Sequence, residues 1–151
     1  MTTTTTLMAD LVVRDPHGRL VALVEVKAGP PMTWEMASRS RDLVLGGNVS
    51  VPYFLLVSEE AAFLWALLQA GGEAPQATSC RMGEIIARYW PSRPVGSRIT
   101  SDQLTFITRL WLLDLAEAFA DELNDEASRC LAHEGLVEAM HGGTVLSEAS
   151  A

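Results

Sequence analysis

The chain has 151 residues, of which 48% are hydrophobic and 20% are charged. That is enough for one domain with a buried core, and it excludes a disordered chain. No apolar run approaches the roughly 18 residues that cross a membrane, and two cysteines are too few for a disulfide scaffold, so a cytoplasmic location is expected. The net charge of −8 argues against a strongly basic nucleic-acid binder, although the whole imbalance falls within residues 101–151.

The N-terminal part of the chain predicts a β-hairpin that follows a disordered leader at residues 1–8. Strands are predicted over residues 9–15 and 19–28. The turn between them, Asp15 to Gly18, has proline and glycine at the positions that suit a type I turn.

A helix and a buried strand follow the hairpin. Thr33 is a suitable N-cap for a helix over residues 34–45, which the glycine pair at 46–47 ends. Residues 51–58 form a continuous apolar run, which is typical of a strand buried on both faces. Together with a short helix predicted over residues 59–70, these elements define an α/β core at 9–72.

The rest of the chain predicts a helical extension that packs on this core, residues 73–141. Thr100 and Gln103 form a capping box for the longest helix. A mobile tail is expected from Gly142. The predicted segments are a linker at 73–79, a helix at 80–90, a loop at 91–99, a long helix at 101–124, a weaker helix at 125–141 and the tail at 142–151.

Two charged residues end the second predicted strand. Glu25 and Lys27 share one face of it, because side chains alternate along a strand. An acid and an amine at the end of a buried strand are costly to desolvate without partners. Lys27 is also the single lysine among eleven basic residues, and its compact ammonium differs chemically from a guanidinium.

The hairpin register decides whether Asp10 joins this pair. A two-residue turn places Asp10 opposite Leu23, so that Asp10 and Glu25 become diagonal neighbours able to share one divalent cation. A three-residue turn with Gly18 as a bulge sends Asp10 to the opposite face instead. The sequence fits both alternatives.

The pattern of Asp10, fourteen residues, then Glu25-Val26-Lys27 resembles the PD-(D/E)XK nuclease superfamily, whose fold is restriction-endonuclease-like. The order of a hairpin, a helix and a further core strand also matches. The segments ADLVVRDPHGRLVALVEVKA and VPYFLLVS are similar to a group of bacterial endonuclease-like proteins. Ala9 replaces the proline of the motif, and the family's opening helix and first strand have no counterpart here.

The resemblance implies a restriction-endonuclease-like mixed sheet followed by helices, and a metal-dependent hydrolase acting on DNA. Asp10 and Glu25, with the carbonyl of Val26, would bind Mg²⁺ or Mn²⁺, which prefer hard oxygen ligands. Lys27 would orient the attacking water or help to deprotonate it.

Nucleic-acid contacts and protein partners are weaker expectations. The arginines in the helix after the motif, or in the basic stretch at residues 81–98, are candidates for phosphate contacts. They are Arg39, Arg41, Arg88 and Arg93. A solvated face, or pairing with the acidic C-terminal helices, explains the last two better, because the acidic C-terminal part of the chain needs counter-charge. The alternative function is a catalytically inactive nuclease-like protein that dimerises or binds a partner through residues 101–124; such a protein should expose an apolar stripe there.

Overall fold

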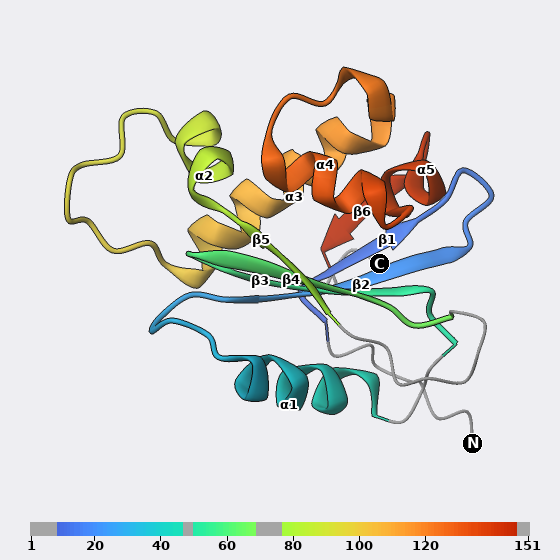
Figure 1. The fold of residues 1–151 in the computed structure, drawn as a ribbon, viewed down its shortest axis with the longest axis horizontal. Coiled ribbons are helices and arrows are strands. Elements are labelled where there is room, and N and C mark those ends of the chain that lie inside the picture. The colour runs from blue at the N-terminus through green and yellow to red at the C-terminus, as the bar shows by residue number, and fades with distance from the viewer. Residues whose placement is uncertain (1–8, 47–49, 69–76, 148–151) are drawn as a thin grey trace.

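A computed structural model describes residues 9–46, 50–68 and 77–147. Its described part is a mixed six-stranded sheet with helices on both faces (Figure 1). The strand order across the sheet is β5-β4-β3-β2-β1-β6. The strands are β1 (Leu11–Arg14), β2 (Leu20–Lys27), β3 (Tyr53–Ser58), β4 (Ala61–Ala66), β5 (Thr78–Arg81) and β6 (Thr144–Ser147).

The predicted hairpin is present, with a register that neither alternative anticipated. The Gly18 N–H donates to the Asp15 carbonyl over 2.9 Å, and the Asp15 N–H donates to the Arg19 carbonyl over 2.9 Å. The loop is therefore the three-residue one, and Gly18 has φ +79°. A second irregularity follows, because Arg14 pairs with Leu20 while Val13 pairs with Ala22, which leaves Val21 without a partner.

The crossover from β2 to β3 was predicted closely. Helix α1 (Trp34–Leu45) begins where the Thr33 side chain accepts the Met36 N–H and ends at left-handed Gly46. Strand β3 then pairs parallel to β2, from Ala22 opposite Tyr53 to Lys27 opposite Ser58. Both strands are interior to the sheet, which explains their nearly continuous apolar sequences.

The prediction of a helix at residues 59–70 is wrong. Ala61–Ala66 form β4, antiparallel to β3, and residues 69–70 lie outside the described residues. The Ser58 hydroxyl accepts the Ala61 N–H over 3.1 Å and closes the tight turn between the two strands. A short apolar run fits a helix or a strand equally well by its pattern, and here pairing with a buried neighbour decides for the strand.

The next two predictions need correction as well. Residues 78–81, split between the expected linker and helix, form β5 beside β4. The helix α2 therefore starts later than expected and spans Gly83–Tyr89. The leader at 1–8 and the linker residues 73–76 lie outside the described residues.

The C-terminal region is helical with more breaks than expected. Helix α3 (Ser101–Glu117) begins with the predicted capping box but ends before residue 124, and a 3₁₀ turn (Ala120–Glu122) follows. The expected helix at 125–141 is two helices, α4 (Glu126–His133) and α5 (Leu136–Met140), separated at Gly135 with φ +90°. Residues 144–147, expected in a mobile tail, form β6 against β1.

Two apolar clusters lie on opposite faces of the sheet. Helices α2 to α5 cover one face, and α1 covers the other (Figure 1). The larger cluster includes Leu11, Val24 and Trp111, and the smaller one includes Val12, Leu23 and Ala37 of α1. Leu23 packs in the smaller cluster with Ala37 of α1. Glu25 lies on the same face of β2 as Leu23, so it faces that helix as well.

Candidate functional site

Asp10 lies directly beside Glu25 at the end of the hairpin. Its backbone N–H donates to the Val24 carbonyl over 2.9 Å, and its carboxylate oxygen Oδ2 accepts the Val26 N–H over 2.7 Å. Asp10 therefore holds the residues on both sides of Glu25 in the chain. The three-residue turn alone would have turned Asp10 away, and the unpaired Val21 offsets that shift.

Glu25 and Lys27 lie on one strand face, as predicted, and form an ion pair there. The Lys27 Nζ lies 3.4 Å from the Glu25 Oε1. The glutamate is the buried member, with 12% of its side chain exposed, against 50% for the lysine. The pair is thus held by a carboxylate shielded from water, and the ammonium reaches the surface.

The Glu25 carboxyl is hard to ionise in this setting. Its pKa is raised from 4.5 to about 7. Burial is the main cause, and the nearby charge of Asp10 is the second. The Lys27 ammonium acts in the opposite direction and lowers the pKa of Glu25, without offsetting the other two effects. A buried carboxyl that resists ionising beside the negative charge of Asp10 is a favourable place for a cation.

A pocket of about 250 Å³ opens over this pair, between the end of β2 and helix α1. Helix α1 contributes residues at three- and four-residue spacing, which lie on one face of a helix. The pocket is lined by Glu25, Lys27, Ser40, Leu43 and Val44. Ser40, Leu43 and Val44 were not among the residues expected at the site, although their spacing within a correctly predicted helix is a signal that could have indicated them.

The donors available here fit a hard divalent cation. Asp10 and Glu25 supply carboxylate oxygens. The N–H and C=O of one strand residue point to the same side, so the Val26 carbonyl faces the side on which Asp10 lies. Asp10 and Glu25 are two side-chain ligands, and within residues 9–46, 50–68 and 77–147 no group of three or more His, Cys, Asp or Glu side chains is arranged to hold a metal ion. The remaining ligands of an ion at this site would be water, as magnesium sites commonly have.

The two arginines of α1 are placed differently from each other. Arg39 is exposed. Arg41 bonds to its neighbour Asp42 over 2.9 Å, and its guanidinium lies 5.4 Å from the centre of the Trp65 ring. Neither arginine lines the pocket over Glu25.

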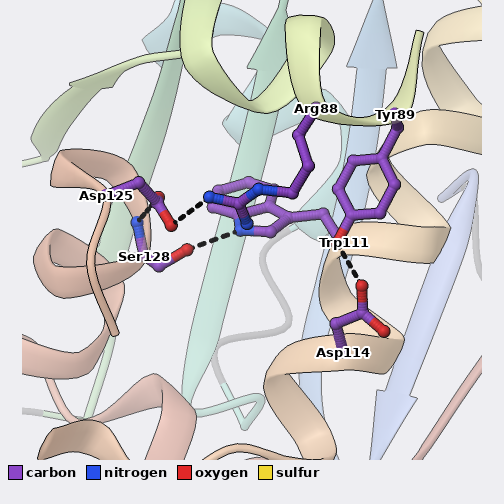
Figure 2. Close-up of polar contacts among 6 residues, drawn as sticks. All are labelled: Arg88, Tyr89, Trp111, Asp114, Asp125 and Ser128. Atoms are coloured by element: carbon purple, nitrogen blue, oxygen red, sulfur yellow. Dashed lines mark hydrogen bonds and ion pairs between the residues drawn. The ribbon is translucent and has the colours of Figure 1, made fainter. Parts of the chain in front are cut away.

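The two arginines of the basic stretch are engaged within the protein. Arg88 donates to Asp125 over 2.7 Å, and Asp125 also accepts the Ser128 N–H over 2.7 Å (Figure 2). Trp111 donates to the Ser128 hydroxyl over 2.9 Å. This arrangement joins α2, α3 and α4 and agrees with pairing to the acidic helices.

Arg93 is engaged in the loop after α2. It donates to Glu59, to the Ser97 hydroxyl over 3.2 Å and to the Ser97 carbonyl over 2.7 Å. Its guanidinium lies 5.7 Å from the centre of the Trp90 ring. Arg93 therefore ties the loop to the turn between β3 and β4.

The apolar stripe expected of a partner-binding helix at 101–124 is mostly buried. Helix α3 packs Leu104, Trp111 and Leu115 into the core. The large hydrophobic side chains exposed in this stretch are Phe106 and Phe119. No continuous apolar stripe is therefore exposed along residues 101–124.

Comparisons of the chain with protein-family models, with curated proteins and with solved structures find no match. In the described ranges, none of the helices has the length and apolar character needed to span a membrane.

Proposed function

We propose that the protein is a metal-dependent nuclease that hydrolyses phosphodiester bonds in DNA. The observation that carries the proposal is the convergence of Asp10, Glu25 and Lys27 at one end of the β2 strand, beside a pocket. The β2–α1–β3 order, with β2 and β3 parallel, supports it because the PD-(D/E)XK resemblance implies the same order. Strand β1, which directly follows Asp10, is also not at the sheet edge, since β6 pairs with it on its outer side.

Each side chain has a role that follows from its contacts. Asp10 and Glu25, with the Val26 carbonyl, would hold Mg²⁺ or Mn²⁺. The bound ion would stabilise the charge that develops on the phosphate. Asp10 is held in place by the Val26 N–H, so one of its oxygens is already oriented.

Lys27 would position the attacking water. Its ammonium is held 3.4 Å from Glu25 while half of its side chain stays exposed, so it reaches both the carboxylate and the solvent. A glutamate that ionises only near pH 7 would ionise more readily once a cation neutralises the pair. The proposal retains the cytoplasmic location expected from the sequence.

The first test is a titration of the ¹⁵N-labelled protein with Mg²⁺ and Mn²⁺, followed by amide NMR. We expect shifts centred on Asp10, Glu25 and Val26 in the wild type and their loss in Glu25→Gln. Glu35→Gln is the matched control, because Glu35 is exposed in the first turn of α1. A wild-type protein that shows no shifts at millimolar metal would contradict the proposal.

The second test is cleavage of linear and supercoiled DNA with Mg²⁺. The wild type and Glu35→Gln should cleave, whereas Asp10→Asn and Lys27→Met should not. Equal activity in all four proteins would indicate a contaminating nuclease and remove the support for this site.

A further inference from the structure

A second and larger pocket, of about 830 Å³, opens at the same end of the sheet as Lys27. It lies between the β3–β4 turn, the end of β5, helix α2 and the loop that follows α2. Lys27 pairs with Ser58, and Glu59 and Glu60 of the pocket come directly after Ser58. Neighbouring strands are about 4.8 Å apart, so the turn that carries Glu59 and Glu60 begins one strand away from Lys27. Helix α2 places the rest of the pocket on the sheet face opposite to α1, so a nucleic acid that reaches both pockets would pass around this end of the sheet.

One wall of this pocket is flat and rigid. Trp90 is half-buried, and the Arg93 guanidinium lies over its ring. Arg93 is fixed there by its bonds to Glu59 and to both oxygens of Ser97. Nucleic-acid bases stack on aromatic rings and on guanidinium planes, and this wall offers both surfaces.

The rim of the pocket carries two charges of opposite sign. Glu60 and Arg81 are both exposed, and neither forms an ion pair in the part of the chain that the structure describes. They lie close together, because Arg81 at the end of β5 pairs with Ala61, the residue that directly follows Glu60. The apolar floor between them includes Ala61 and Ile86.

We propose that this pocket binds a nucleobase of the nucleic-acid substrate, and that guanine is the base it fits best. The Glu60 carboxylate accepts hydrogen bonds from N1–H and N2–H₂, and the Arg81 guanidinium donates to O6 and N7. The base stacks against the wall made by Trp90 and Arg93. This inference rests on the proposed nuclease function for its biological role, but the binding itself needs neither metal nor cleavage.

The test is binding of dGMP to the full chain without metal, followed by amide and indole NMR. We expect shifts at the Trp90 indole N–H and at the backbone of Gly83 and Ala87, which line the pocket. The other deoxynucleotides should bind more weakly, and 2-deoxyribose 5-phosphate, which has no base, should produce no such shifts.

Variants identify the contacts. Trp90→Leu should weaken dGMP binding about tenfold or more, whereas Trp90→Phe should retain most of it because a stacking ring remains. Glu60→Gln should reduce the preference for guanine. The controls are Glu122→Gln and Phe106→Leu, which change an exposed glutamate and an exposed aromatic residue away from the pocket.

The outcomes separate this inference from the nuclease proposal. Equal binding of dGMP and 2-deoxyribose 5-phosphate, or no shift at the pocket with millimolar dGMP, would overturn it whatever the cleavage assay shows. Asp10→Asn should abolish cleavage and leave dGMP binding unchanged. Loss of dGMP binding in Asp10→Asn would also overturn it, because it would place the nucleotide at the metal site instead.

Discussion

Replacing Glu25 by glutamine should make the protein more stable at neutral pH. The pKa of Glu25 is raised from 4.5 to about 7, because the side chain is buried and lies near Asp10. Between these two pH values the folded protein holds a proton that the unfolded chain has released. Wild-type stability therefore falls as the pH rises from about 4.5 to about 7, and the destabilisation is complete above pH 7.

The size of the effect follows from the shift. Each pKa unit corresponds to about 1.4 kcal/mol, so the ionised Glu25 destabilises the folded state by at most about 3 kcal/mol. Glutamine resembles the protonated acid in shape and does not titrate. The stability difference between Glu25→Gln and the wild type should thus grow by up to about 3 kcal/mol between pH 4.5 and pH 8.

The assay is urea denaturation at pH 4.5, 6 and 8, followed by tryptophan fluorescence. The carboxyls that do not interact with Glu25 titrate alike in both proteins, so their contributions cancel in the difference. Glu35→Gln is again the control, because it removes an exposed carboxyl outside the pocket over Glu25. A flat difference for Glu25→Gln would refute the reasoning, as would an NMR titration of the Glu25 carboxyl centred near 4.5.

Three further outcomes follow from the same contacts. Lys27→Met should raise the pKa of Glu25 further and Asp10→Asn should lower it, as ¹³C NMR of the Glu25 carboxyl would show; shifts in the reverse directions would contradict the pair described here. Asp125→Ala removes both the Arg88 contact and the cap at Ser128, so it should lower the free energy of unfolding by about 1–3 kcal/mol in urea denaturation, while the exposed Asp121→Ala should have little effect. Deleting residues 144–151 should make the protein aggregate, as measured by light scattering, because β1 would become an edge strand. A deletion variant that stays monomeric and fully folded would contradict the pairing of β6 with β1.

The elements that the sequence predicted well are those specified by local signals. Thr33 and Gly46 mark both ends of α1, and the capping box marks the start of α3. The ends of these elements depend on residues within one turn of the helix, so neighbouring sequence suffices to predict them.

The elements that were missed depend on partners distant in the sequence. The run that forms β4 has no decisive periodicity, and its pairing with β3 makes it a strand. The four residues of β6 are too short to signal a strand alone, and their hydrogen-bonding partner is β1 at the other end of the described chain.

The candidate site shows the same division. The shared face of Glu25 and Lys27 follows from strand alternation, and the 3.4 Å ion pair confirms it. The position of Asp10 could not be decided, because it depends on both the three-residue turn and the unpaired Val21. No pattern at Val21 distinguishes a bulged residue from an ordinary valine in a strand.

The pairing of β6 with β1 has a consequence for synthesis of the protein on the ribosome. Arg14 is made early and its partner Thr144 comes 130 residues later. At roughly 5–20 residues per second, β1 waits several seconds or more with one edge unpaired. During that interval the nascent chain is exposed to pairing with other chains, so aggregation is more of a hazard during synthesis than after β6 has paired.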